Sequence, residues 1–111
     1  MKVADEIRGF KAKEISEEGL AELQEAARRG RISSVLATSV ANSGHPGGAL
    51  SSMDIYTLLL AVANVSPKTA DDVERDRIVV SHGHTSAGFY SALAEYGFFK
   101  AEDMIANFRR T

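Results

Sequence analysis

A single short run of β-branched residues stands among segments that otherwise carry helical periodicity. The run is Ile78-Val79-Val80, with charged residues before it and Gly83 after it, a pattern typical of a strand buried on both faces. Such a strand needs hydrogen-bonding neighbours on both edges, and no other segment of the chain reads as a strand. We therefore predict an α/β fold in which these 111 residues are the mostly helical leading fragment of a parallel-sheet domain.

The longest periodic segment predicts one helix from about 16 to 41. Ser16 is its expected N-cap because two glutamates follow it, and a break at Gly30 is the alternative. Mostly large apolar residues recur at i, i+3, i+4, i+7 and i+8 in its second half. They are expected to form the buried stripe of the helix: Ile32, Val35, Leu36, Ser39 and Val40. Residues 1–15 show no such period and read as an irregular arm.

Three further helices are expected. Ser51 and Asp54 have the spacing of a capping box and predict a helix over about 52–63. That helix is apolar around most of its circumference, so it is expected to lie at the centre of the domain. The other two helices are predicted from about 85 to 96 and from about 101 to 107.

Composition excludes several classes of function. The 13 basic and 15 acidic residues leave a net charge of −2, which provides no basic excess for holding nucleic acid. The absence of cysteine removes disulfides and thiolate metal sites. No secretory signal or membrane-spanning apolar stretch is found. A cytoplasmic protein without nucleic-acid or membrane partners is the expectation.

All three histidines lie in two glycine-containing turns that each lead into a predicted helix. His45 is in the loop 42–48, and His82 and His84 follow the predicted strand in the turn Ser81-His82-Gly83-His84. Helix N-termini present free N–H donors and the positive end of the helix dipole, and ligands of open α/β sheets bind where strands end. The two turns therefore predict a site for a small anionic ligand such as phosphate.

Other chemistry at these turns is less well supported by the residues. His82 and His84 are two positions apart and would share one face if the strand extended through them, as a metal-binding pair does. Because Gly83 ends the strand and no third ligand is close in sequence, we predict no metal site. His82 is expected to be exposed or hydrogen-bonded locally. Ser43 and Ser81 lack the surroundings of a nucleophilic serine.

Two longer strings carry a resemblance to a known family. ANSGHPGG covers residues 41–48, and RDRIVVSHGH covers residues 75–84 ahead of a predicted helix. Together they resemble the start of the N-terminal pyrophosphate-binding domain of transketolase, and above all the N-terminal half of split, two-subunit transketolases. The resemblance divides the chain into an arm at 1–15 and a partial thiamine-diphosphate-binding domain at 16–111.

The resemblance implies roles for two residues. His45 matches the family histidine that lies beside the reacting carbon of the thiazolium ring and contacts the ketose donor, so it is the expected catalytic residue. His84 matches the histidine that hydrogen-bonds the pyrophosphate of thiamine diphosphate, so it is the expected cofactor-binding residue. His82 falls where the family often has Asn or Lys, and it is given no role. The implied reaction transfers a two-carbon ketol unit from a ketose phosphate to an aldose phosphate.

The resemblance also implies parts that these residues do not include. The family segment that binds Mg²⁺ is expected beyond residue 111, and the glutamate that activates the cofactor belongs to another domain. We therefore expect a transketolase fragment of the pentose phosphate pathway that is inactive by itself. Its expected partners are sugar phosphates, the remaining transketolase domains or a C-terminal subunit, and a second copy bound through the 52–63 helix and the strand. A non-catalytic association or regulatory module with the same fold is the alternative.

Overall fold

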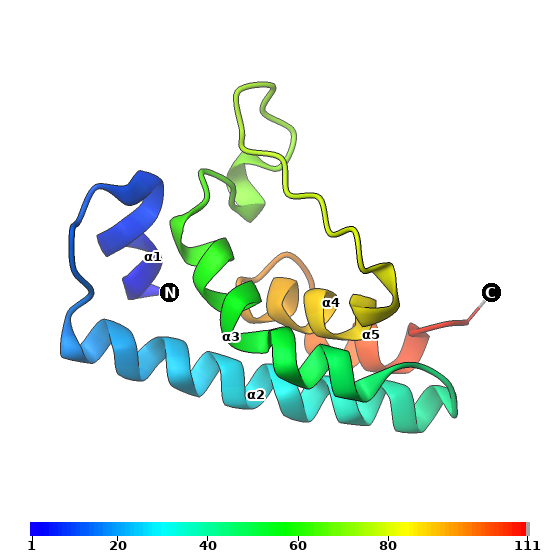
Figure 1. The fold of residues 1–111 in the computed structure, drawn as a ribbon. Helices are drawn as coiled ribbons and strands as arrows, with labels where there is room; N and C mark the ends of the chain where they lie inside the picture. The colour runs from blue at the N-terminus through cyan, green and yellow to red at the C-terminus, as the bar shows by residue number, and fades with distance from the viewer. Residues whose placement is uncertain (111) are drawn as a thin grey trace.

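The computed structural model describes residues 1–110 and shows a helical fold (Figure 1), with no strand among those residues. Its α-helices are α1 (Lys2–Ile7), α2 (Glu17–Ala41), α3 (Pro46–Val62), α4 (Ser86–Glu95) and α5 (Ala101–Asn107). Short 3₁₀ helices cover Arg8–Phe10, Pro67–Thr69 and Gly83–Thr85. Among the described helices none is both long and apolar enough to cross a membrane.

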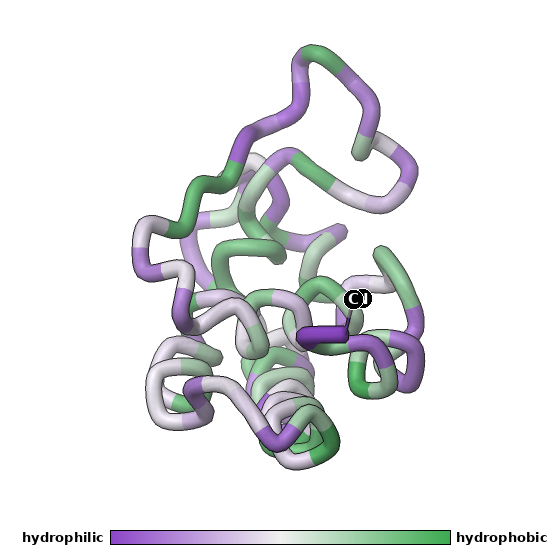
Figure 2. Tube along the Cα trace, turned by 90° about the vertical axis from the view of Figure 1, so that its right-hand side faces the viewer, coloured by the Kyte–Doolittle hydropathy of each residue, from purple (hydrophilic) through white to green (hydrophobic). Residues whose placement is uncertain are grey.

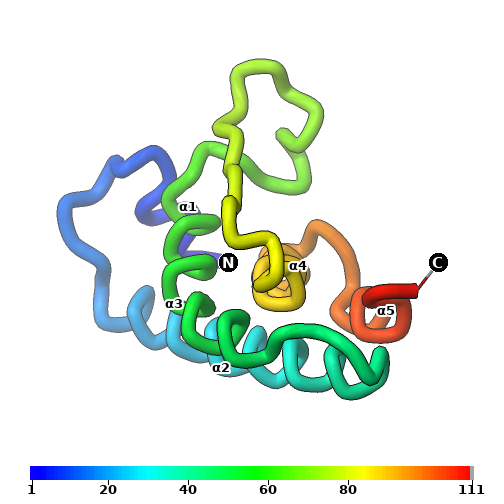
Figure 3. The backbone as a smooth tube through the Cα atoms, turned by 45° about the vertical axis from the view of Figure 1, so that its right-hand side comes forward, coloured from blue at the N-terminus to red at the C-terminus, as the bar shows by residue number. Residues whose placement is uncertain are grey.

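The long helix α2 is the platform on which the other helices pack. Figure 3 views α4 nearly along its axis, with α3 on one side, α5 on the other and α2 beneath. The central core cluster lies where α2, α3 and α4 meet, and its buried members are Ala27, Met53, Tyr56, Leu60 and Ala92. The segment between α3 and α4 leaves this bundle as a projecting loop (Figure 1).

The predicted single helix over residues 16–41 is confirmed. The Ser16 hydroxyl accepts a hydrogen bond from the backbone N–H of Gly19 at 3.0 Å, as an N-cap does. The helix ends where Asn42 takes a left-handed conformation with φ of 48°. Gly30 does not interrupt it: a Cβ at this position would lie 2.6 Å from the sulfur of Met53, so the glycine admits a core side chain of α3.

The predicted buried stripe of α2 is wrong, because small residues face the core instead. Ser33, Ser34, Ala37 and Thr38 are buried, and the hydroxyls of Ser34 and Ser91 lie 3.1 Å apart across the α2–α4 contact. Small side chains allow the helices to approach so closely that larger ones do not fit between them. Four large residues consequently lie on the opposite, exposed side, which we term the aliphatic face of α2: Ile32, Val35, Leu36 and Val40, each 43–48 % exposed.

Helix α3 begins earlier than the sequence pattern predicted. Pro46 is its first residue and His45 its N-cap, so Ser51 lies inside the helix and its hydroxyl donates to the carbonyl of Gly48 rather than forming a capping box. Proline is favoured in the first turn, where its missing N–H costs nothing. The helix is also less buried than expected, because Ile55 is 67 % exposed.

The predicted strand at Ile78–Val80 is not formed within residues 1–110. A strand requires a neighbouring backbone to complete its hydrogen-bond ladder, and no other extended segment among the described residues supplies one. Ile78 and Val80 pack instead against the central core cluster, while Val79 between them is 89 % exposed. Figure 2 shows this stretch as hydrophobic, following a largely hydrophilic loop.

The irregular arm predicted for residues 1–15 is also wrong in part, because α1 and a 3₁₀ helix form there. A helix as short as α1 is unstable alone, so tertiary contacts must hold it. Val3 and Ile7 are buried in a cluster with Leu23 and Ala61. The Glu22 carboxylate of α2 accepts hydrogen bonds from the first backbone N–H groups of α1, including that of Val3 at 2.8 Å.

The hydroxyl of Tyr96 is expected to make the fold less stable as the pH rises above about 10. This hydroxyl donates to the carbonyl of Thr57 at 2.6 Å, and burial raises the pKa of Tyr96 well above its ordinary value of 10.0, opposed by Arg8 and assisted by Glu22. Above about pH 10 the unfolded chain loses this proton while the folded chain keeps it, so folding loses up to about 1.4 kcal/mol per pH unit.

We expect the urea midpoint of the chain to fall between about pH 9 and about pH 11. Tyr96→Phe should flatten this dependence, whereas Tyr90→Phe, at an exposed position, should leave it unchanged. Equal pH dependence in the original chain and in Tyr96→Phe would contradict the assignment.

Candidate functional site

The structure brings the two histidine turns together at one corner of the fold. His45 is the N-cap of α3, and His84 lies in the 3₁₀ helix that leads into α4. Their ring centroids are 5.5 Å apart and the rings are nearly perpendicular, at 89°. The corner therefore gathers both sequence-predicted site residues from turns that are far apart in the chain.

A glycine makes this close approach possible. A Cβ placed on Gly48 would lie 2.6 Å from the Cγ2 atom of Thr85 and 3.5 Å from the Nε2 atom of His84. Contacts as short as the first do not occur between real side chains, so residue 48 must be glycine for the two turns to pack in this way. A Cβ on Gly47 would meet nothing within 4 Å, which leaves the backbone at the start of α3 open to a ligand.

The polar groups at this corner suit an anion. The first-turn N–H groups of α3 have no partner within the helix, and no side chain caps them. The positive end of the α3 dipole and the exposed imidazoles of His45 and His84 lie at the same place. Within residues 1–110, no three side chains of the metal-binding types are grouped so that they could hold a metal ion.

His82, which sequence reasoning left without a role, lies beside this pair. Its ring centroid is 6.1 Å from that of His84, and its Nε2 atom is 3.0 Å from the hydroxyl of Tyr56. The same hydroxyl is 2.6 Å from the Oγ1 atom of Thr85. Sequence analysis missed Tyr56 and Thr85, because nothing local marks a core tyrosine of α3 as the partner of a turn so far along the chain.

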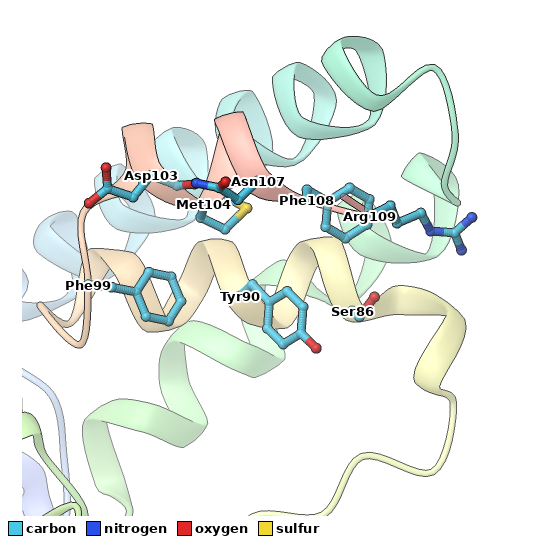
Figure 4. Close-up of a pocket in the computed structure, with 8 residues that line it drawn as sticks. All are labelled: Ser86, Tyr90, Phe99, Asp103, Met104, Asn107, Phe108 and Arg109. Carbon is cyan, nitrogen blue, oxygen red and sulfur yellow. The ribbon is translucent and has the colours of Figure 1, made fainter. Parts of the chain in front are cut away.

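An apolar pocket lies next to this corner but does not contain the histidines. It has a volume of about 550 Å³ between α4 and α5 (Figure 4), and its lining residues are Ser86, Tyr90, Phe99, Asp103, Met104, Asn107, Phe108 and Arg109. Arg109 links it to the loop before α3, because its guanidinium donates to the Ser43 hydroxyl at 2.7 Å. The pocket is mostly apolar, whereas the two imidazoles lie together at the histidine corner.

Comparison with known proteins gives the family. The family model described as the thiamine diphosphate binding domain of transketolase matches residues 23–111. Human transketolase is 38 % identical over 90 residues, which are 79 % of this chain and 14 % of the human protein. The transketolase of Bacillus subtilis is 41 % identical over 81 residues, 72 % of this chain and 12 % of that protein. Transketolase 1 of Candida albicans is 39 % identical over 77 residues, 69 % of this chain and 11 % of that protein.

No solved structure matches the chain. The chain spans between 11 and 14 % of the length of these curated relatives. The family model covers both histidine turns and every helix from α3 onward. The chain therefore belongs to the transketolase family and corresponds to its thiamine diphosphate-binding domain.

Proposed function

We propose that this chain forms one wall of the active site of a transketolase, the wall that binds the pyrophosphate of thiamine diphosphate and orients the ketose donor. The reaction is the transfer of a two-carbon ketol unit from a ketose phosphate to an aldose phosphate, a step of the pentose phosphate pathway. The observation that carries the proposal is the 5.5 Å approach of His45 and His84 at the N-terminus of α3. Two imidazoles and open backbone N–H groups match the donors that a diphosphate requires.

The residues present fit thiamine diphosphate, with His84 and the N–H groups of Gly47 and Gly48 holding its diphosphate. The cofactor, when bound, supplies the thiazolium carbon that adds to the ketose carbonyl. His45 would contact the hydroxyl groups of the donor, and its exposed position leaves room for that substrate. We assign the Mg²⁺ ligands to family segments beyond residue 111, in keeping with the small share of the relatives that this chain spans.

The same proposal gives partners to two features of the fold. The extended segment Ile78–Val80 would pair with strands of the remaining transketolase domain, which would complete a parallel sheet. The aliphatic face of α2 would be covered by those domains, by a C-terminal subunit or by a second copy of the chain. A non-catalytic association module would use this face in the same way but would not need the histidine corner.

We expect the chain alone to show no ketol transfer and to bind thiamine diphosphate weakly. A diphosphate is held in large part through its metal ion, and residues 1–110 contain no cluster of three or more histidine or carboxylate side chains that could hold one. Calorimetric titration with the cofactor, with and without Mg²⁺, measures this. A micromolar dissociation constant that depends on Mg²⁺ would contradict the expectation, as would measurable turnover by the chain.

A further inference from the structure

Three side chains at the histidine corner form a hydrogen-bonded unit that has no assigned role. The Tyr56 hydroxyl contacts the Thr85 hydroxyl at 2.6 Å and the Nε2 atom of His82 at 3.0 Å. The Thr85 hydroxyl also contacts the backbone carbonyl of His82 at 2.9 Å. Tyr56 is 3 % exposed and Thr85 is 1 % exposed, so the bond between these two hydroxyls is buried. The bonds to His82 are partly buried, and His82 itself is exposed.

The carbonyl of His82 also accepts from the backbone N–H of Thr85 at 3.1 Å, and only one arrangement of protons makes all three side-chain contacts hydrogen bonds at once. In that arrangement the single hydroxyl proton of Thr85 is donated to the carbonyl of His82, because a carbonyl oxygen can only accept. The Thr85 oxygen must then accept the proton of Tyr56 across the 2.6 Å contact. Tyr56 has no second proton, so its oxygen accepts from His82, and the Nε2 atom of His82 must carry a hydrogen.

We propose that Tyr56 and Thr85 are positioning residues that hold His82 as the Nε2–H tautomer and thereby make it a third residue of the site. The Nδ1 atom of His82 makes no hydrogen bond within the described residues, so its lone pair is free, and it belongs to a ring whose centroid lies 6.1 Å from that of His84. That atom accepts a hydrogen bond, or a proton, from a hydroxyl group of the bound substrate. The identity of this substrate rests on the proposed function, but the tautomer does not.

The arrangement suits a group that gains and loses a proton. Nε2 donates to Tyr56 in both the neutral and the protonated imidazole, so protonation at Nδ1 breaks none of the three bonds. The ring of Tyr56 lies almost parallel to that of His82, at 16°, and is itself packed edge-on against Phe89 at 5.4 Å. The core of the fold therefore sets the orientation of an exposed imidazole.

The test is the tautomer of His82, read from the ¹⁵N shifts of its ring in the ¹⁵N-labelled chain, at a pH above which those shifts no longer change. We expect Nε2–H in the original chain. Thr85→Val removes the acceptor of the Tyr56 proton, which then turns to Nε2, so His82 should switch to the Nδ1–H tautomer. Thr85→Ser retains the hydroxyl and should leave His82 as Nε2–H.

Double variants show whether the switch depends on Tyr56. Adding Tyr56→Phe to Thr85→Val should abolish the switch, because no hydroxyl proton remains. Adding Tyr96→Phe, which removes the hydroxyl of another largely buried core tyrosine, should leave the switch in place. Circular dichroism checks that each variant folds. Nδ1–H in the original chain, or no switch in a folded Thr85→Val variant, would overturn the proposal.

The role toward substrate has a separate readout. In transketolase assembled with this chain, Thr85→Val should raise KM for the ketose phosphate about 10-fold, since a hydrogen bond is worth about 1.4 kcal/mol, with a smaller change in kcat. Thr85→Ser should have the same KM for the ketose phosphate as the original chain. An unchanged KM together with a switched tautomer would overturn the contact to substrate. An assembly without any ketol transfer would refute the proposed function, while the tautomer experiment would still decide the positioning role.

Discussion

Replacing His45 by alanine is expected to lower the turnover of ketol transfer about 100-fold or more in a transketolase that contains this chain, with the dissociation constant of thiamine diphosphate nearly unchanged. The imidazole stands at the N-cap of α3 and is exposed where the donor would bind. A side chain that positions the reacting donor can contribute this much to a reaction rate, because misplacement by about 1 Å costs roughly 100-fold. Steady-state kinetics at saturating cofactor measure the loss.

His84→Ala should show the opposite pattern. Its imidazole lies over Gly48 at the start of α3, where the diphosphate would bind, and the loss of one hydrogen bond to a charged oxygen costs about 1.5–3 kcal/mol. Cofactor affinity should therefore fall by roughly one to two powers of ten, while turnover at saturating cofactor changes less. Calorimetric titration of the assembled enzyme measures the affinity. If His45→Ala weakened the cofactor and His84→Ala lowered turnover, the two roles would have to be exchanged.

The second large effect concerns association. We expect the chain alone to form homo-oligomers through the aliphatic face of α2, where four large side chains are each 43–48 % exposed. Monomeric proteins rarely leave a contiguous apolar patch of this kind uncovered, and a symmetric pair of helices would bury the same face on both copies. The surface differs from the one expected from sequence, which placed the contact on the 52–63 helix and the strand.

Sedimentation equilibrium distinguishes this surface from others on the same helix. The original chain should have an apparent mass above its 11.9 kDa monomer mass, and Leu36→Lys should return it to the monomer. Leu20→Lys is the matched control, because Leu20 is 50 % exposed against 46 % for Leu36 but lies outside the aliphatic face. A folded original chain that stays at the monomer mass at every concentration would contradict the expectation, and equal effects of both substitutions would place the contact elsewhere.

Local signals were reliable where the deciding interaction lies within a few residues. The hydrogen bond of the Ser16 cap and the left-handed conformation of Asn42 are each set within one turn of the helix. They fix the first and last residues of α2, which agree with the predicted range. The same holds for the helices expected at about 85–96 and 101–107: α4 differs by one residue at each end, and α5 has the predicted bounds. The backbone hydrogen bonds of a helix join residues four positions apart, so a single segment of sequence contains the information needed to predict one.

The choice of which face is buried was not a local matter. Hydropathy predicted that Val35 and Leu36 would face the core, yet Ser34 and Ala37 do so. A hydrophobic stripe marks what must be covered, but the size of the facing side chains decides how closely two helices pack. Large aliphatic groups turned outward become understandable once the close α2–α4 contact through Ser34 and Ser91 is seen.

Local patterns in the sequence predicted α2, α4 and α5, the two glycine turns and the family resemblance that implies roles for His45 and His84. Three features could be found only in the folded chain: the 5.5 Å distance between the rings of His45 and His84, the bonds from Glu22 to a helix in the N-terminal arm and the contact of Tyr56 with His82. The difference comes from how far apart in the sequence the interacting residues are. Caps and periodicity are interactions along the chain, whereas packing, burial and the direction of a hydrogen-bonded proton depend on residues that only the fold makes neighbours.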